Sequence, residues 1–377
     1  MDAHPHGSRQ WAPARIVAID LARAIAVVGM LAVHVGPTDL RGATGRIYAA
    51  PHGRASLLFV LVAGIGVTLL ARSRSGSSGE ARLRLLWRAA LLLPVGLALQ
   101  GLDHGANVIL QNYAVLFLVA VVAIGLTDRW LLVLAGLSAT LGPLAYLAAQ
   151  QTAPVAFERN GTALTDPALE VINRLVLTGA FPLVTWAFPL LLGMWLGRQD
   201  LRARRTQAWL IVGGGTVALA SVTTSRLLVA TFGTPTEPVG LGHLIVTTAH
   251  SQMPLWLVGG TGSAAFVLGL SLVAADRATR WIRPLVALGQ LAFTVYVGHL
   301  VAIAAAPDLL TSDTVGPAIG RVTVLTVVAV LLANAWRRRF ARGPLEALLQ
   351  LPWVVPRGQP VSREVTPARV EVRDRGA

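Results

Sequence analysis

Long apolar runs constrain this chain more than any other feature of its sequence. A helix that crosses a bilayer needs about 20 mostly apolar residues, with about 17 as a lower limit. Such runs lie near residues 16–35, 55–71, 85–101, 108–126, 130–149, 180–197, 208–229, 254–275, 285–305 and 317–335. They lack the period-two alternation of barrel strands and exceed such strands in length. The sequence therefore predicts an all-α, polytopic integral membrane protein with about ten transmembrane helices.

The arginines indicate which ends of these helices face the cytoplasm. All 32 basic residues are arginine, and the net charge is +14. With the N-terminus inside, most of them fall in inner loops and in the C-terminal tail. The outer exceptions are Arg41, Arg46, Arg54, Arg159, Arg174, Arg226 and Arg321. This asymmetry follows the positive-inside rule, so we expect both termini in the cytoplasm and a multi-pass protein of the inner (plasma) membrane. The charge then reflects topology and contact with anionic membrane lipids, and no nucleic-acid partner is expected.

Two residue types are missing, and each absence excludes a class of chemistry. Without lysine, the chain lacks a phosphate-loop lysine and cannot form a Schiff base. Without cysteine, it has no disulfides, thiolate nucleophiles or cysteine–zinc sites. No zinc-ligand spacing such as HExxH is present, so no metal is expected. Arginine-only, alanine-rich composition is typical of GC-rich bacterial genomes.

The polar segments divide the chain. The expected parts are a cytoplasmic tail (1–14), a transmembrane domain (15–336), a basic stop-transfer segment with an interfacial helix (337–355) and a disordered cytoplasmic tail (356–377). The longest outer connection is 150–178, which is polar and mixed in charge.

Three ionisable residues lie within the first span: Asp20, Arg23 and His34. Such residues are costly in a bilayer, so each suggests a functional site. Helical geometry places Arg23 and His34 on one face, about 16 Å apart along the axis. Asp20 can pair with Arg23 at i,i+3. The alternative is a structural ion pair and a histidine that bonds a neighbouring helix. Because the span is long and charged, we expect it to remain as an uncleaved anchor.

Histidines are concentrated towards the outer side. Apart from two in the N-terminal tail, they are His34, His52, His104, His243, His250 and His299. Histidine transfers protons readily near neutral pH, so these residues can line one outer cavity. Alternatively, outer loops simply tolerate histidine.

Several stretches resemble a known group of membrane enzymes. DLARAIAVVGMLAVH carries the arginine, ten residues, histidine pattern of the acyltransferase-3 membrane family. The other matching stretches are PHGRASLLFVLVAG, ILQNYAVLFLVA, FPLVTWAFPLLLGMWLGRQDL, TAHSQMPLWLVGGTGSA, LGQLAFTVYVGH and GPLEALLQ. In order, they resemble the catalytic region of heparan-alpha-glucosaminide N-acetyltransferase and bacterial DUF418 proteins.

This resemblance implies acyl transfer across the membrane from cytoplasmic acetyl-CoA to an acceptor on the far side. The position that matches the family's catalytic histidine is His52, just before Gly53. Three features differ from that group. His34 stands where the group usually has asparagine, Ala24 follows Arg23 where it has glycine, and the acidic residue early in span two is absent. His34 and His52 therefore both remain candidates for the base.

Acyl transfer from a thioester needs a base and a stabiliser for the oxyanion. Asp39 follows His34 with four residues between them, and it can fold back to orient the His34 imidazole. It therefore joins His52, His34, Arg23 and Asp20 in the catalytic set. The substrate-binding candidates are Arg54, Gln111, Asn112, Tyr113, His250, Tyr296 and His299. The phosphates of CoA favour arginine, and the candidates at inner span ends are Arg82, Arg84, Arg88 and Arg198. For each of these four arginines, the alternative is that it only follows the positive-inside rule and does not bind CoA.

The leading hypothesis is therefore a membrane-bound acyltransferase, with acetyl as the expected group. Its acceptor is a glycan, a lipid-linked sugar or an exported small molecule, and a homodimer is one option for its assembly. A proton-coupled permease or exporter that uses the same polar stripe is the main alternative. A non-catalytic membrane scaffold is the third, because fold does not establish function.

The topology can be tested with single cysteines, since the chain has none of its own. A cysteine at Ser78 should resist a membrane-impermeant maleimide in intact cells and react after permeabilisation. A cysteine within 150–178 should react in intact cells. Labelling at Ser78 before permeabilisation would contradict the orientation.

Overall fold

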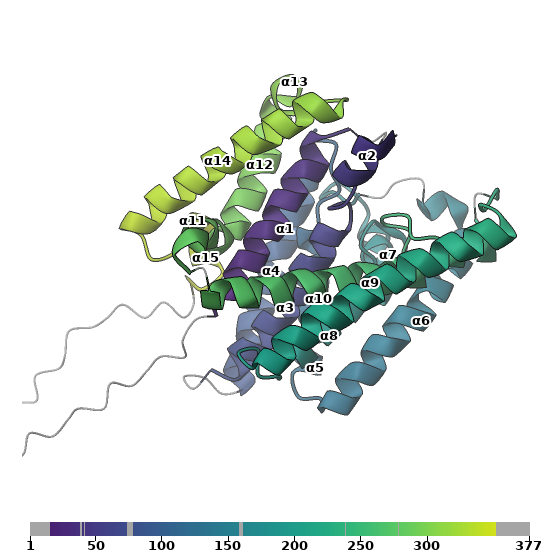
Figure 1. Cartoon of the computed structure of the whole chain (residues 1–377), viewed down its shortest axis with the longest axis horizontal. Coiled ribbons are helices and arrows are strands. Elements are labelled where there is room, and N and C mark those ends of the chain that lie inside the picture. The colour runs from purple at the N-terminus through teal and green to yellow at the C-terminus, as the bar shows by residue number, and fades with distance from the viewer. Residues whose placement is uncertain are drawn as a thin grey trace, which may run out of the picture.

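The computed structural model describes residues 16–37, 40, 42–73, 78–157, 161–237, 239–277 and 279–351. Regular structure in these residues is entirely helical (Figure 1). The elements are α1 (Val17–Val35), α2 (Gly42–Tyr48), α3 (Arg54–Ala71), α4 (Ser78–Gln100), α5 (Leu110–Ala123), α6 (Asp128–Thr152), η1 (Pro154–Phe157), α7 (Ala168–Asn173), η2 (Arg174–Thr178), α8 (Leu183–Leu196), α9 (Arg204–Phe232), η3 (Leu241–Ile245), α10 (Pro254–Arg277), α11 (Thr279–Gln290), α12 (Ala292–Ala305), α13 (Pro307–Leu310), α14 (Val315–Arg339) and α15 (Pro344–Leu348). Asp39, Arg41, Arg159 and both expected tails lie outside the described residues.

The prediction of an all-α polytopic membrane protein is confirmed. Within the described residues, 7 helices are long and apolar enough to cross a membrane, or up to 9 if each of two bent pairs is one span. The bent pairs are Ala168–Thr178 with Leu183–Leu196, at 59°, and Arg280–Gln290 with Ala292–Ala305, at 66°. The run near 108–126 forms only the shorter helix α5. The runs near 180–197 and 285–305 thus belong to bent pairs rather than to straight spans.

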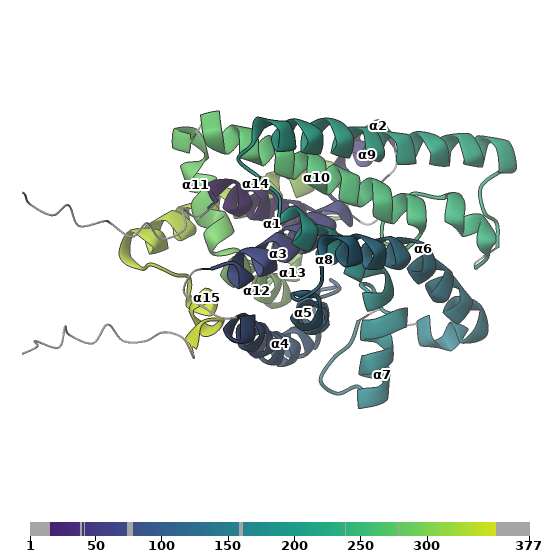
Figure 2. The same ribbon diagram turned by 90° about the horizontal axis from the view of Figure 1, so that it is seen from below.

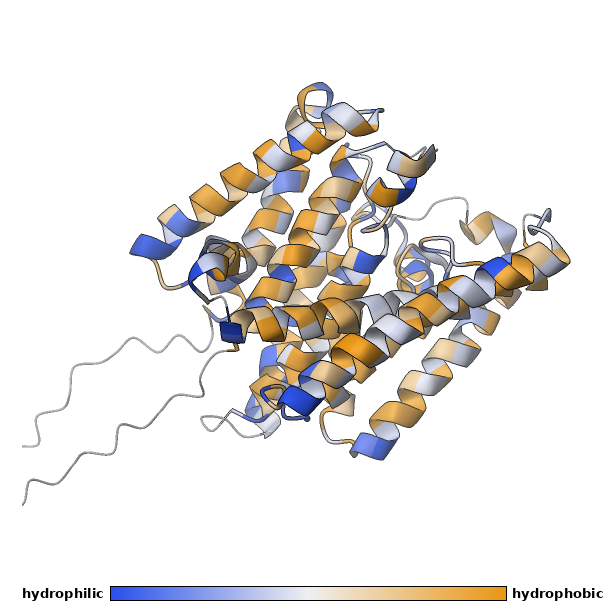
Figure 3. Cartoon of the chain, viewed as in Figure 1, coloured by the Kyte–Doolittle hydropathy of each residue, from blue (hydrophilic) through white to orange (hydrophobic). Residues whose placement is uncertain are grey.

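The two ends of the helices differ in chemistry, and we call them the basic end and the histidine end. The basic end holds the start of α1, the start of α9 and the end of α14 with Arg337, Arg338 and Arg339. The histidine end holds the loops before α3, α5 and α10. The middle turns of α6, α9 and α14 carry many hydrophobic residues, while hydrophilic residues collect at their basic ends (Figure 3). Many of these hydrophobic side chains are exposed. This is the pattern expected of helices that face lipid.

Helix α1 occupies a central position. It contacts α3, α10, α11, α12 and α14, and more than half of its span is buried (Figures 1 and 2). By contrast, α14 has 6% of its span buried and α9 has 17%. Helices α9 and α14 therefore form the periphery, and their exposed leucines and valines are available to lipid.

The polar residues of α1 are satisfied inside the protein. Arg23 Nη1 donates to Asp20 Oδ1 at 3.0 Å, and Gln290 Nε2 donates to the other carboxylate oxygen at 3.3 Å. Next to this pair, Gly289 of α11 lies so close that an added Cβ would sit 1.7 Å from the Asp20 carbonyl oxygen. The expected ion pair is thus present, and it marks the tightest approach between α1 and α11.

Helices α3 and α8 cross through facing glycines. An added Cβ at Gly193 would lie 2.1 Å from the carbonyl oxygen of Leu61, and one at Gly64 would lie 2.2 Å from that of Leu190. Small residues at a helix crossing let the backbones approach closely in a membrane. The crossing therefore fixes the middle of α3 against α8.

We predict that Gly193→Ala destabilises the protein by about 1–3 kcal/mol, because the backbones must separate to admit the methyl group. Gly136→Ala in α6 is the matched control, since an added Cβ there meets nothing within 4 Å. The control should be neutral or stabilising by up to about 1 kcal/mol. Melting curves in detergent measure both, and equal melting temperatures for the two variants would contradict the tight crossing.

Candidate functional site

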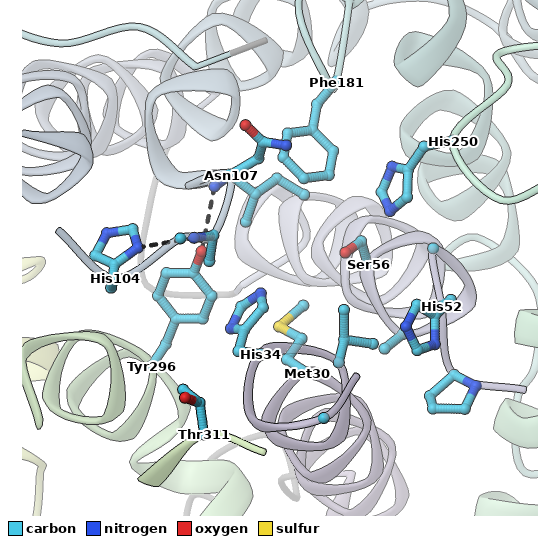
Figure 4. Close-up of a pocket in the computed structure, with 18 residues that line it drawn as sticks. Met30, His34, His52, Ser56, His104, Asn107, Phe181, His250, Tyr296 and Thr311 are labelled. Atoms are coloured by element: carbon cyan, nitrogen blue, oxygen red, sulfur yellow. Dashed lines mark hydrogen bonds between the residues drawn. The ribbon is translucent and has the colours of Figure 1, made fainter. Parts of the chain in front are cut away.

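A cavity of about 400 Å³ opens at the histidine end (Figure 4). Its walls come from α1, the turn before α3, the α4–α5 loop, the segment before α8, the loop before α10, and α12. The polar or aromatic side chains that line it are His34, His52, Ser56, His104, Asn107, Phe181, His250, Tyr296 and Thr311. Four of the six histidines that follow the N-terminal tail therefore share one cavity, which we call the histidine cavity.

His34 is held by a fifth histidine. Its Nδ1 lies 2.8 Å from Nε2 of His299, and the two ring planes are nearly parallel at 3°. His299 Nδ1 lies 3.1 Å from the carbonyl oxygen of Val295. Because a carbonyl only accepts, neutral His299 carries its proton on Nδ1 and accepts at Nε2. His34 then donates from Nδ1 and carries its lone pair on Nε2, the tautomer that a general base requires.

Tyr296 lies beside this pair with its hydroxyl at the start of α5. The backbone N–H of Ile109, the N-cap residue of α5, donates to the Tyr296 hydroxyl oxygen at 3.2 Å. The Tyr296 ring lies 6.5 Å from that of His34, centroid to centroid. Since the oxygen accepts from the backbone, the phenolic proton is free to be donated to another group. A helix N-terminus also favours negative charge nearby.

His250 stands on a strained loop and is surrounded by aromatic rings. Its φ is +59°, a value that is uncommon for any residue but glycine. Ring centroids of Phe181, Trp256 and Trp186 lie 5.4, 5.6 and 6.2 Å from its own. The strain is maintained by Gln252, whose side chain donates to the Ala180 and His250 carbonyls. Strain of this kind is concentrated at functional sites.

The turn carrying His52 packs directly against this loop. Gly53 has a φ of +70°, and an added Cβ there would lie 2.6 Å from Cζ2 of Trp256 and 3.4 Å from Nε2 of His250. Nδ1 of His52 and Nδ1 of His250 are buried, and neither has a hydrogen-bond partner among the described residues. Buried polar atoms are normally satisfied, so these two atoms are available to a ligand or to water.

His104 and His243 have hydrogen bonds that stabilise loops. His104 Nε2 donates to the Leu99 carbonyl at 2.9 Å, and its Nδ1 accepts from the Ala106 N–H at 3.1 Å. Both of its ring nitrogens are therefore used in shaping the α4–α5 loop. His243 donates to the Glu237 carbonyl at 2.8 Å and does not line the histidine cavity.

A second cavity, of about 320 Å³, opens at the basic end. Four arginines line it: Arg23, Arg88, Arg337 and Arg342. Arg88 Nε is buried and has no hydrogen-bond partner in the described part of the chain. We call this the arginine cavity. Three residues, Met30, Ile109 and Tyr296, line both cavities. The two cavities therefore meet across a wall that is one side chain thick.

Glu346 of α15 fixes the helix that carries much of this wall. Its Oε1 accepts from the N–H groups of Phe293 and Thr294 at 2.8 and 3.0 Å, and its Oε2 accepts from the Thr294 hydroxyl at 2.6 Å. These bonds cap the first turn of α12 at the bend after α11. Helix α15, which lies in the segment where an interfacial helix was expected, thus packs against α12, and Glu346 itself lines the arginine cavity.

The sequence-derived candidates are distributed unevenly around the two cavities. His34, His52, His250 and Tyr296 line the histidine cavity, and His299 lies directly behind His34. Arg23 and Tyr113 line the arginine cavity instead. Asp20 is buried with Arg23 and Gln290. Asp39 lies outside the described residues.

Three expected donors at the histidine end line neither cavity. Arg54 donates to the Ala50 carbonyl at 3.2 Å. Asn112 donates to the Phe181 carbonyl at 2.7 Å, which connects α5 to the segment before α8. Gln111 packs against Gly96 of α4, where an added Cβ would lie 2.4 Å from the Gln111 backbone nitrogen.

Of the four arginines proposed for CoA, only Arg88 lines the arginine cavity. Arg84 pairs with Glu80, and Arg198 pairs with Asp128 at 2.8 Å. Arg82 Nη2 lies near Gly125, at 3.2 Å from an added Cβ. The sequence analysis did not identify Arg337 and Arg342 as candidates. Arginines after a last span have a similar pattern whether or not the chain folds back to place them in a cavity. Ser56 and Asn107 were also missed, since single polar residues at span ends carry no signal.

Together, the fold and the two cavities define a polytopic all-α membrane protein with an opening at each end of its helices. The family model described as protein of unknown function (DUF418) matches residues 195–353. This stretch, which is similar to that family, runs from the end of α8 to α15 and includes His250, Tyr296, His299 and Glu346. No curated protein matches the chain. No group of three or more His, Cys, Asp or Glu in the described ranges is placed to hold a metal ion.

The histidine cavity should make stability depend on pH. Burial and, to a smaller extent, the neighbouring His52 lower the pKa of His250 from 6.5 to about 4, and the nearby Ala180 carbonyl partly opposes the shift. Burial also lowers the pKa of His52. The unfolded chain therefore takes up these protons first, so stability is complete above about pH 6.5 and falls as the pH approaches 4.

We expect the wild type to lose about 2 kcal/mol through His250 alone between pH 6.5 and pH 5, because one pKa unit corresponds to about 1.4 kcal/mol. His250→Asn should flatten this slope, since asparagine tolerates the positive φ but does not titrate. His243→Asn is the matched control and should keep the wild-type slope. Melting temperatures across the pH series give the answer, and equal slopes in all three proteins would contradict the assignment.

Proposed function

We propose that this protein is a membrane-bound acyltransferase that moves an acyl group, expected to be acetyl, from cytoplasmic acyl-CoA to an acceptor on the other side of the membrane. One observation carries the proposal. A cavity lined by arginines and a cavity lined by histidines open at opposite ends and meet at Met30, Ile109 and Tyr296. A donor with phosphates and an acceptor with a hydroxyl or amine can therefore approach one another without either crossing the bilayer.

The arginine cavity matches the chemistry of the donor. Phosphates bind arginine through charge-assisted and often bidentate hydrogen bonds. Arg88, Arg337 and Arg342 belong to three different segments and surround one space. The unpartnered Nε of Arg88 gives this space a buried donor. With the nucleotide end of CoA held there, its pantetheine arm would carry the thioester towards Tyr296.

His34 is the better supported base. The bonds from His34 to His299 and from His299 to Val295 leave the lone pair of His34 on Nε2. In the proposed reaction, the acceptor hydroxyl or amine gives its proton to this nitrogen and attacks the thioester carbon. The carbon–sulfur bond then breaks, and the leaving thiolate takes the proton back from His34. His299 acts as a positioning residue.

Tyr296 is placed to stabilise the charge that develops in this step. Its oxygen already accepts from Ile109, so its proton can be donated to the carbonyl oxygen of the thioester as that oxygen becomes negative. The N-terminus of α5 adds a favourable dipole. His52 and His250, with their unpartnered Nδ1 atoms, would bind the acceptor.

A permease or exporter is the second candidate, because one feature favours it as well. Two cavities that open at opposite ends and are separated by a thin wall are also what an alternating-access transporter would have. The His34–His299 pair would then relay protons. The two proposals differ in one respect: only the transferase needs acyl-CoA.

Acetyl transfer from radiolabelled acetyl-CoA to envelope extracts tests the proposal, with melting curves in parallel. His34→Ala should lower the rate by about 10²–10⁴-fold, as loss of a general base does. It should still show the thermal stabilisation that acetyl-CoA gives the wild type. Arg342→Gln should reduce that stabilisation without removing the residual rate at saturating donor.

His243→Ala is the control for the histidine substitutions, because His243 bonds only a loop carbonyl outside the cavity. If His52→Ala abolishes transfer while His34→Ala does not, then His52 is the base and His34 is not. If neither variant changes the rate, the histidine mechanism is wrong. Absence of any stabilisation by acetyl-CoA, CoA or longer acyl-CoAs would favour the permease.

A further inference from the structure

A third space lies outside both cavities, between α12 and α14. It is an open groove of about 800 Å³. The residues that line it are Leu31, Leu291, Thr294, Val295, Gly298, His299, Ala302, Leu325, Val328, Ala329, Leu332, Ala333, Ala335, Trp336, Arg338, Arg339, Phe340 and Pro344. Aliphatic side chains dominate the middle, and two arginines stand at the basic end. In the proposed acyl transfer, neither donor nor acceptor enters this space, although His299, which positions His34, borders it.

The groove exists because α14 packs mainly against helices other than α12. It packs against α1 and α11, so that it diverges from α12 and leaves a gap (Figure 1). Small residues on the facing side of α12 keep the gap open: an added Cβ at Gly298 meets nothing within 4 Å. The span of α14 is only 6% buried, so the gap lies at the lipid-facing surface.

A groove of this composition within a bilayer is filled by hydrocarbon, because water gains too few hydrogen bonds from aliphatic walls. Its length also suits a lipid tail. From Leu325 to Arg339, the α14 side spans about 21 Å at 1.5 Å per residue. Half of the hydrocarbon core is about 15 Å thick. The groove therefore covers one leaflet together with the start of its headgroup region.

The basic end of the groove indicates what kind of headgroup the lipid carries. Arg338 and Arg339 are exposed, and no ion pair of the described residues involves either one. Beside them, the ring of Trp336 stacks on Phe340 at 4.3 Å between centroids. Aromatic rings next to arginines are typical of the membrane–water interface. Two unpaired positive charges there would attract a phosphate-bearing anionic headgroup.

We infer that the groove between α12 and α14 is a binding site for one anionic phospholipid of the leaflet at the basic end. Arg338 and Arg339 hold its phosphate, and one acyl chain lies along Gly298 and reaches His299. The lipid fills the space that α14 leaves beside α12. It thereby packs against the outer side of the helix that carries both Tyr296 and His299.

Lipid binding can be measured by native mass spectrometry of the full chain released from nanodiscs of equal phosphatidylglycerol and phosphatidylcholine. One phosphatidylglycerol molecule per chain should be retained. Gly298→Phe should abolish retention by filling the groove. The double variant Arg338→Gln/Arg339→Gln should weaken it by about tenfold or more, because each basic side chain near the surface contributes separately.

Two matched controls separate this site from general lipid contact. Gly320→Phe also enters open space on α14, but away from the groove. Arg204→Gln/Arg205→Gln removes two exposed arginines from the basic end of α9. Both controls should retain the lipid as the wild type does, and both should keep its melting temperature.

Three results would overturn the inference. One is retention of phosphatidylcholine and phosphatidylglycerol in equal amounts, which would exclude headgroup recognition. The second is phosphatidylglycerol retention that Gly298→Phe does not reduce. The third is a dimer that carries no lipid and that Gly298→Phe dissociates, since a second copy would then occupy the groove.

Discussion

A bilayer offers no water to polar groups within it, and the arrangement around α1 follows from that constraint. Asp20 pairs with Arg23, and Gln290 donates a hydrogen bond to the other oxygen of the Asp20 carboxylate. His34, further along α1, is satisfied by His299. Each of these bonds needs a close neighbour, so α11 and α12 must pack directly on α1. The position of the candidate base therefore depends on the same contacts that allow α1 to lie in a membrane at all.

Helix α12 connects the parts of the candidate site. Its first turn is capped by Glu346, its middle carries Tyr296 in the wall between the cavities, and the next turn carries His299 behind His34. The outer side of the same helix borders the groove to which we assign a phospholipid. A change at the capped end or in the groove would thus reach the histidine pair through one rigid element, without any direct contact with a substrate.

Much of the fold was predictable from the sequence, because bilayer-length apolar runs and arginine asymmetry are strong signals. The Asp20–Arg23 pair was predictable too, since both residues lie on one helix. The contact between His34 and His299 was not, because it joins residues 265 positions apart. The same limit applies to the arginines: local sequence could not show that Arg337 and Arg342 fold back towards Arg88. Hence the sequence identified the kinds of residue that form the site, but not which of them lie together in space.

The i,i+3 spacing of Asp20 and Arg23 has a consequence for membrane insertion during synthesis. Helix α1 is synthesised before its partners in α11, Gln290 and Gly289, which follow some 270 residues later. During this interval, α1 must reside in the membrane without them. Because its two charges neutralise each other within a single turn, the nascent helix can leave the insertion machinery as an electrically neutral segment. The later helices then close around a pair that has already formed.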